Sequence, residues 1–170
     1  GVPVLRRASG GSTIIAGPGC LMYSVLISYK KRPAWRSLDV AHHGVMSRVA
    51  SATQKSLDAF QIPLTVDLQG TCDLTIESQK FSGNALRCKR NVMLYHGTIL
   101  ISMSLDWIDR YLREPPRQPD YREKRTHRSF VRNLLRNDEV SSGEFAMRWC
   151  EAAKVCWEAD QCWDNFTLQS

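Results

Sequence analysis

Three short polar segments hold the residues of this sequence that could do chemistry on an anionic substrate. The first, RRASGGST, places Arg7 before the adjacent glycines Gly10 and Gly11. Because glycine lacks a Cβ, backbone N–H groups there can approach a phosphate or carboxylate closely, and an arginine can bind such a group through two hydrogen bonds. A hairpin turn with exposed arginines explains the same residues. The segment is neither GxGxxG nor a phosphate-binding loop ending in GK[ST], so neither nucleotide motif is indicated.

The second and third segments are QKFSGNALRCKR and YHGTILI. Lys80 precedes a turn of small residues, where its ammonium could neutralise a phosphate or the negative charge that develops in acyl transfer. His96, Gly97 and Thr98 interrupt an apolar run, as expected of a strand that borders a pocket. Taken alone, these segments are explained more simply by a surface lysine before a turn and by a buried, hydrogen-bonded histidine.

The elements that must position these residues form an α+β domain with a mostly antiparallel sheet flanked by helices. Alternating or apolar runs predict strands at 2–7, 13–16, 21–28, 64–68, 73–78, 79–83 and 92–105. Helical spacing predicts helices at 42–60, 105–112, 129–136 and 141–159. The last helix opens with a capping box formed by Ser141 and Glu144.

Composition favours a single globular domain over residues 1–170, with 43% hydrophobic and 24% charged residues. The sequence contains neither a signal peptide nor an apolar run long enough to cross a membrane. These features predict a cytoplasmic protein, or an organellar one if the source is eukaryotic. Its six cysteines include no CxxC pair and no histidine at zinc-finger spacing, so thiols are expected rather than a zinc site or disulfides. Because the chain starts with Gly1, an upstream segment is expected to be missing.

The net charge of +6 is concentrated between Arg110 and Arg136, in a stretch broken by three prolines. Such a run predicts a solvated basic surface that attracts an acidic partner. It lacks the interleaved aromatic residues on which nucleic-acid bases stack, so an acidic protein is favoured over nucleic acid.

Together and in this order, the three segments resemble the signature of the lipoate–protein ligase A family. The matching residues are RRASGGST, then Cys72-Asp73-Leu74 followed by KFSGNA, and finally His96-Gly97-Thr98. The downstream YLREPPRQPDYREKRTHRSFVRNL is also similar, so the resemblance spans roughly Val4 to Leu135. It implies a catalytic domain of the biotin/lipoate ligase type, similar to class II aminoacyl-tRNA synthetases. The domain is expected to lack its N-terminal segment and a C-terminal accessory domain.

The resemblance implies an activity as well as a fold. Members of this family use ATP with Mg²⁺ to convert lipoate or octanoate to an acyl-adenylate. They then transfer the acyl group to a lysine of an acidic carrier domain, as in 2-oxoacid dehydrogenase complexes or the H-type protein of glycine cleavage. A monomer is expected, without nucleic acid or membrane as partner.

The resemblance also assigns roles to residues. Lys80 would be catalytic and contact the mixed anhydride, Asp73 would orient the incoming amine or the adenylate, and the apolar strands would wall an acyl tunnel. Arg7 and the glycine turn would face the phosphate and the acyl carboxyl. The expected substrate-binding residues are Arg7, Ser9, Gly10, Gly11, Ser12, Thr13, Ile14, Ile15, Asp73, Lys80, Gly83, Ala85, His96, Gly97 and Thr98, and no metal ligand is expected.

Two departures from the family pattern leave alternatives open. Ser12 stands where a third glycine is usual, and Ala16 where a histidine is often found, which leaves acyl-adenylate binding better supported than ATP use. One alternative is therefore an ATP-independent octanoyl or lipoyl transferase with a thioester on Cys72 or Cys88. Another is a non-catalytic module that binds nucleic acid through its basic face.

Overall fold

An antiparallel five-stranded sheet is the scaffold of the protein in a computed structural model that describes residues 2–136 and 140–158. The strands lie in the order β1-β5-β4-β3-β2. Their bounds are Cys20–Ser28 for β1, Asp67–Gln69 for β2, Asp73–Ile76 for β3, Gln79–Cys88 for β4 and Val92–Leu100 for β5. The helical elements are η1 (Pro33–Arg36), α1 (Leu38–Ala59), α2 (Asp106–Tyr111), η2 (Asp120–Arg122), α3 (His127–Phe130) and α4 (Ser142–Glu158). The predicted α+β architecture is confirmed.

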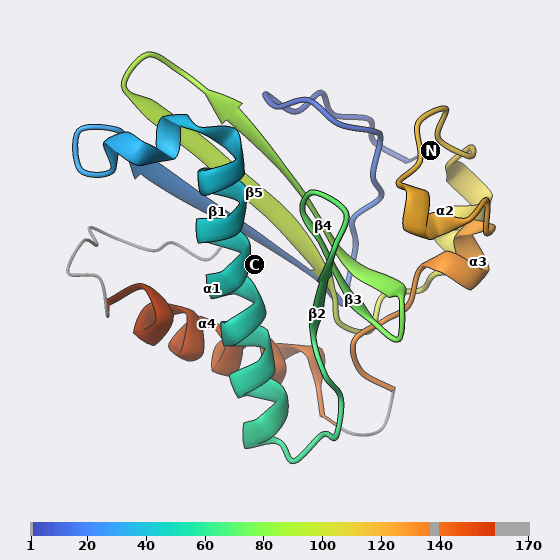
Figure 1. Cartoon of the computed structure of the whole chain (residues 1–170). Helices are drawn as coiled ribbons and strands as arrows, with labels where there is room; N and C mark the ends of the chain where they lie inside the picture. Colours follow the sequence, from blue (N-terminus) through green and yellow to red (C-terminus); the bar gives the residue numbers. More distant parts are fainter. Residues whose placement is uncertain (1, 137–139, 159–170) are drawn as a thin grey trace.

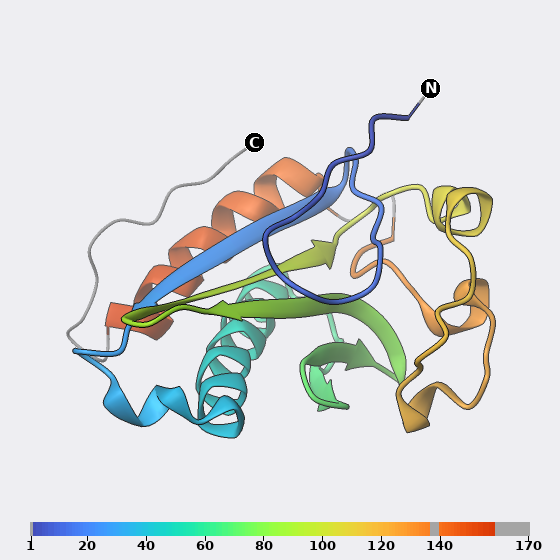
Figure 2. The ribbon, with the colours of Figure 1, turned by 90° about the horizontal axis from the view of Figure 1, so that it is seen from above.

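The long helices α1 and α4 cover one face of the sheet and leave the other face open to the remaining segments (Figures 1 and 2). In β1, buried and exposed residues alternate, as expected of a strand with one face in the core. The ring of Tyr23 in β1 lies 5.4 Å from that of Trp149 in α4. The indole N–H of Trp149 donates to Thr53 Oγ1 of α1 at 3.0 Å, and this buried hydrogen bond joins the two helices.

The capping box predicted for the last helix is present. The backbone N–H of Glu144 donates to Ser141 Oγ at 3.2 Å, and the backbone N–H of Ser141 donates to the Glu144 carboxylate at 3.2 Å. This reciprocal pair satisfies donors that the first helical turn leaves free. The predicted end of the helix at Ala159 lies outside the described residues.

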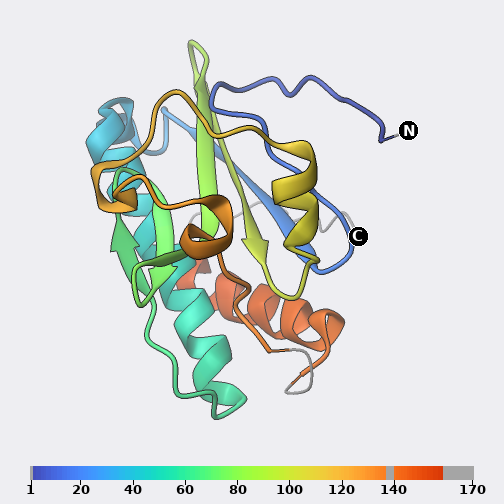
Figure 3. The same ribbon diagram turned by 90° about the vertical axis from the view of Figure 1, so that its right-hand side faces the viewer.

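The strands predicted at 2–7 and 13–16 are wrong. Residues 2–19 form an irregular segment that crosses the open side of the sheet, opposite α1 (Figure 3). Backbone carbonyls in this segment are bound by side chains, since Arg7 donates to Gly10 and Ser12 and Arg87 donates to Ala8. These three carbonyls lie in the turn between the two predicted strands, and neither flanking run pairs with the sheet.

Other boundaries also differ from prediction, since β2 begins at Asp67 rather than 64 and β5 ends at Leu100 rather than 105. Helix α1 begins at Leu38 rather than 42, and β4 continues to Cys88 instead of ending at 83. The helix expected at 129–136 is only the single turn α3, because the chain after it runs extended beside the sheet. There the N–H groups of Leu134 and Leu135 donate to the carbonyls of Leu100 and Ile101 at 2.7 and 3.0 Å.

Among the described residues, Cys20, Cys72, Cys88, Cys150 and Cys156 are free thiols, as predicted, and Cys162 lies outside them. No helix within 2–136 and 140–158 has the length and apolar character needed to cross a membrane.

Candidate active site

The sheet brings the polar segments of the second and third motifs together on its open face. In the antiparallel register, Asp73 of β3 lies opposite Gly83 of β4, and Gly83 lies opposite Thr98 of β5. Ala85 lies opposite His96 in the same way. Because residues opposite each other point to the same face, these five residues share the face away from α1 and α4.

A β-bulge turns Lys80 toward that face. The register between β3 and β4 shifts at Leu74/Thr75, where Phe81 is the extra residue. Phe81 and the residue after it are both buried, so the strict alternation of the strand is broken. Lys80 consequently emerges beside Asp73, and its Nζ lies 2.7 Å from Asp73 Oδ1. Bulges commonly re-aim a side chain next to a functional site.

Lys80, Asp73 and Tyr121 form the polar centre of the candidate site. Asp73 accepts from Lys80 at Oδ1 and from the Tyr121 hydroxyl at Oδ2, the latter at 2.8 Å. Gly83 leaves room for this arrangement, since a Cβ at that position would lie 3.0 Å from Lys80 Nζ and 2.9 Å from its Cε. Burial, followed by the negative charge of Asp73, raises the pKa of Tyr121. Tyr121 therefore remains a hydrogen-bond donor at physiological pH.

The N-terminal segment is attached to the same face. Ser9 Oγ lies 2.5 Å from His96 Nε2, and the guanidinium of Arg87 donates to the carbonyl of Ala8. Burial, with a smaller effect from the positive charge of Arg7, lowers the pKa of His96. His96 is thus neutral at physiological pH, and its Nε2 forms one hydrogen bond with the Ser9 hydroxyl, as donor or as acceptor according to the tautomer.

Arg7 closes the glycine turn instead of projecting from it. Its Nε and Nη2 donate to the carbonyl of Gly10 at 3.1 and 2.9 Å, and Nη2 also donates to the carbonyl of Ser12 at 2.6 Å. Gly11 sits against the Arg7 guanidinium and within van der Waals distance of Ala85, where a Cβ would be 3.9 Å away. The turn is therefore a compact loop laid over β4, in which the arginine binds protein carbonyls.

Other predicted residues lie apart from this centre. Thr13 and Ile14 are exposed, while Ile15 packs with Leu100, Met103 and Ile108 beneath α2. These residues border the loop, but no described contact joins them to Lys80.

Gly97 belongs to the opposite, buried face of the sheet. A Cβ there would lie 1.7 Å from Asn84 Oδ1 and 3.0 Å from Cε1 of Tyr23. There the Tyr23 hydroxyl donates a hydrogen bond to Asn84 Oδ1, and Asn84 Nδ2 donates to the Cys72 carbonyl at 2.7 Å. Gly97 thus supports the site from behind, by leaving space for a buried polar network.

A family model for the lipoyl protein ligase A/B catalytic domain matches residues 1–154. The chain belongs to this family. Octanoyltransferase LipM of Oceanobacillus iheyensis is 26% identical over 147 residues, covering 81% of this chain and 53% of that protein. Lipoate–protein ligase 1 of Staphylococcus aureus is 25% identical over 147 residues, covering 85% and 41%. The chain thus spans about half the length of these relatives or less.

Two solved structures share the fold. A bi-partite lipoate protein ligase of Thermoplasma acidophilum matches with a TM-score of 0.66 at 22% identity, covering 90% of this chain and 57% of that one. A lipoate-protein ligase A bound with ATP matches with a TM-score of 0.65 at 20% identity, covering 90% and 58%. The expected lipoate ligase fold is thereby confirmed.

The two candidate nucleophilic cysteines occupy poor positions. Cys72 is half-buried behind the sheet, and its thiol donates to the carbonyl of Asn84 at 3.2 Å. Burial, with a smaller effect from Asp73, raises the pKa of the Cys72 thiol, which disfavours the thiolate. Cys88 is exposed at the far end of β4, eight residues or about 26 Å from Lys80 along the strand.

The basic stretch between Arg110 and Arg136 is solvated only in part, because three of its arginines, Arg122, Arg125 and Arg132, are buried or half-buried. Arg122 is buried, with its guanidinium on the Glu114 carboxylate and 4.7 Å from the ring centroid of Phe130. Arg125 donates to the carbonyl of Ser78 at 3.0 Å. These arginines pair with internal acceptors because the proline-broken segment has no regular hydrogen bonding of its own. The exposed cations of the stretch are Arg110, Arg113, Arg117, Lys124, Arg128 and Arg136.

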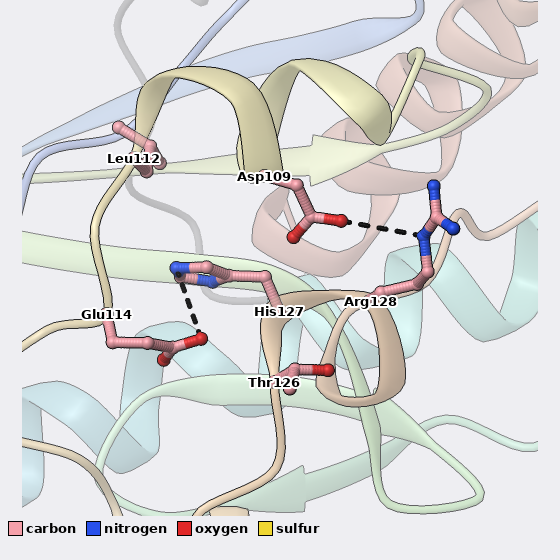
Figure 4. Close-up of a pocket in the computed structure, with 6 residues that line it drawn as sticks. All are labelled: Asp109, Leu112, Glu114, Thr126, His127 and Arg128. Carbon is pink, nitrogen blue, oxygen red and sulfur yellow. Dashed lines mark ion pairs between the residues drawn. The ribbon is translucent and has the colours of Figure 1, made fainter.

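A hollow of about 480 Å³ lies between α2 and α3 (Figure 4). Its lining residues are Asp109, Leu112, Glu114, Thr126, His127 and Arg128, none of which was a predicted site residue. Arg128 Nε lies 3.5 Å from Asp109 Oδ2, and His127 Nε2 lies 3.9 Å from Glu114 Oε1. The Glu114 carboxylate also binds the guanidinium of Arg122, and Arg128 also binds Asp106, so these charged groups have protein partners.

Proposed function

We propose that this domain uses ATP to activate lipoate or octanoate and transfers the acyl group to a lysine of a carrier domain. In the first step, a carboxylate oxygen of the acid attacks the α-phosphorus of ATP and pyrophosphate leaves. In the second, the neutral amine of the carrier lysine attacks the acyl carbon, AMP leaves and the nitrogen loses a proton. Family membership supports the reaction class, and one observation carries the assignment of the site: the Lys80–Asp73 pair beside Gly83 on the open sheet face.

Lys80 is the proposed catalytic residue. Its side chain is 29% exposed, so the ammonium is accessible from the open face while Asp73 holds it in place. A positioned cation next to the bridging oxygens of the mixed anhydride stabilises the charge that develops as AMP leaves. Because the pair is partly shielded from water, this stabilisation exceeds that of a fully solvated lysine.

The residues on the open face fit the anionic part of an acyl-adenylate. They present the cation of Lys80 and the neutral imidazole of His96, with the glycine turn folded over Ala85. Within residues 2–136 and 140–158, no three His, Cys, Asp or Glu side chains gather to hold a metal ion. Mg²⁺ is therefore proposed to arrive with the phosphates of ATP, as is usual for nucleotide substrates.

The proposed macromolecular partner is an acidic lipoyl carrier domain. Six exposed cations lie between Arg110 and Arg136, in a segment that adjoins the site through Tyr121. Arg128 among them is paired with Asp106 and Asp109, and the net positive charge of the segment suits an acidic surface. Carrier domains of 2-oxoacid dehydrogenase complexes and the H-type protein of glycine cleavage both remain candidates.

The second candidate is an octanoyl or lipoyl transferase that forms a thioester and needs no ATP. The similarity to octanoyltransferase LipM over 81% of this chain favours it. The high pKa of Cys72 and the remote position of Cys88 count against it.

Pyrophosphate release with lipoate and ATP separates the two candidates. The ligase proposal predicts lipoate-dependent release that persists when Cys72 and Cys88 are both replaced by serine. Mass spectrometry should also detect lipoyl-adenylate but no protein-bound thioester. A thioester on either cysteine, formed without ATP, would establish the transferase instead.

A further inference from the structure

One tyrosine outside the three motifs is bound directly to the candidate catalytic pair. Tyr121 lies in η2, 48 positions from Asp73 in the sequence, yet its hydroxyl donates to Asp73 Oδ2 at 2.8 Å. Lys80 occupies the other carboxylate oxygen at 2.7 Å. The carboxylate of Asp73 is thus held at both oxygens, and its side chain is only 12% exposed. A carboxylate with two fixed donors cannot turn away from Lys80 without losing one of them.

The ring of Tyr121 is itself fixed by packing on two sides. Its centroid lies 5.3 Å from that of Phe130, and its Cε1 lies close to Gly70, where a Cβ would be 3.3 Å away. Gly70 has a φ of +59°, so the turn before β3 both adopts a conformation that suits glycine and leaves room for the ring.

The backbone of η2 is anchored to the strands that carry Asp73 and Lys80. Arg125 Nη2 donates to the carbonyl of Tyr121 at 2.8 Å and to that of Ser78, in the turn between β3 and β4, at 3.0 Å. Arg122, buried against Phe130, fixes the same segment through its Nε, which donates to the Arg125 carbonyl at 2.9 Å. The basic segment is therefore a brace that places the Tyr121 hydroxyl at a set distance from β3.

We propose that Tyr121 is a positioning residue for Lys80 and acts through Asp73. By holding one carboxylate oxygen, it fixes the orientation of Asp73, and Asp73 in turn fixes the ammonium of Lys80 beside Gly83. In this role Tyr121 acts only through its hydrogen bond to Asp73. The inference rests on the proposed function for its catalytic consequence, whereas the coupling between Tyr121 and Asp73 can be measured without it.

The test uses Tyr121→Phe in the full chain, because phenylalanine keeps the ring packed on Phe130 and removes only the hydroxyl. Single-turnover transfer from synthetic lipoyl-adenylate to a lipoyl domain should slow about tenfold, while the affinity for lipoyl-adenylate changes less than twofold. In an Asp73→Asn background, Tyr121→Phe should have no further effect on the rate. Tyr111→Phe, at an exposed tyrosine of α2, is the matched control and should leave the rate unchanged.

Equal transfer rates for Tyr121→Phe and wild type would overturn the proposal. A tenfold loss that persists in the Asp73→Asn background would also overturn it, because the effect of Tyr121 would then not pass through Asp73. If the wild-type chain does not transfer, the proposed function fails. The positioning role is then decided by thermal unfolding of the same double-mutant cycle. Coupled destabilisation of the two variants supports it, and strictly additive effects overturn it.

Discussion

The same substitution at two glycines on neighbouring strands should separate catalysis from stability. In Gly83→Ala, the new Cβ would lie 2.9–3.0 Å from the end of the Lys80 side chain, which must move by a few tenths of an ångström. If Lys80 is catalytic, a misplacement of ~1 Å would cost ~100-fold in rate, so for this smaller shift we expect a loss of about 3- to 10-fold in acyl transfer. The free energy of unfolding should change by less than ~1 kcal/mol, because the ion pair is partly exposed and alanine restricts the unfolded chain.

Gly97→Ala should do the reverse. Its Cβ would fall 1.7 Å from Asn84 Oδ1, inside the buried network with Tyr23. Overpacking costs ~1–3 kcal/mol and the disrupted hydrogen bond about 1 kcal/mol more, so the loss should be ~2–4 kcal/mol. At ~2–4 °C per kcal/mol for a chain of this size, the Tm should fall by about 4–16 °C.

Differential scanning calorimetry and single-turnover transfer on both variants provide the assay, with wild type as reference. The expected pattern is a stable but slow Gly83→Ala and an unstable Gly97→Ala that retains its rate at temperatures where it is folded. If Gly83→Ala transfers at the wild-type rate, the placement of Lys80 against Gly83 is wrong. If Gly97→Ala keeps the wild-type Tm, Gly97 does not lie against the buried hydrogen-bond network of Asn84 and Tyr23 as described.

Two further predictions concern pH and the last helix. Burial lowers the pKa of His96 below its unfolded value, so the unfolded chain binds more protons than the folded one, and the free energy of unfolding should fall as the pH drops through about 6.5 toward the lower folded pKa. The decrease in Tm between pH 7.5 and 5.5 should therefore be smaller in His96→Gln than in wild type. An equal decrease would contradict the burial of this imidazole. Ser141→Ala removes the hydroxyl of the capping box and should cost about 1 kcal/mol in urea unfolding, and an unchanged midpoint would show that the cap does not contribute.

Much of the fold was predictable from local pattern. The alternation in β1 and the Ser141–Glu144 capping box are local signals, and both predicted elements are present. The strands predicted in the N-terminal segment are absent: the turn between them is closed locally by Arg7 and attached to β4 by the distant Arg87, and apolar periodicity contains no information about that attachment.

The residues of the candidate site could be singled out from the sequence, whereas their arrangement could be predicted only in part. Asp73, Lys80 and His96 lie on neighbouring strands, so antiparallel pairing was enough to bring their segments together. The bulge at Phe81 and the contact with Tyr121 could not be predicted, because the first depends on register and the second on a loop that returns from 48 residues away. In the sequence, Tyr121 stands among the charged residues of PDYREKR, and nothing in that local pattern marks it.

The central claim is that Lys80 acts on an acyl-adenylate at the open sheet face. Single-turnover transfer from synthetic lipoyl-adenylate to a lipoyl domain, followed by mass spectrometry of the acceptor lysine, tests it most directly. Wild type and Lys89→Met, which changes an exposed lysine beyond the far end of β4, should transfer equally. Lys80→Met should transfer at least 100-fold more slowly. Wild-type transfer by Lys80→Met would contradict the account.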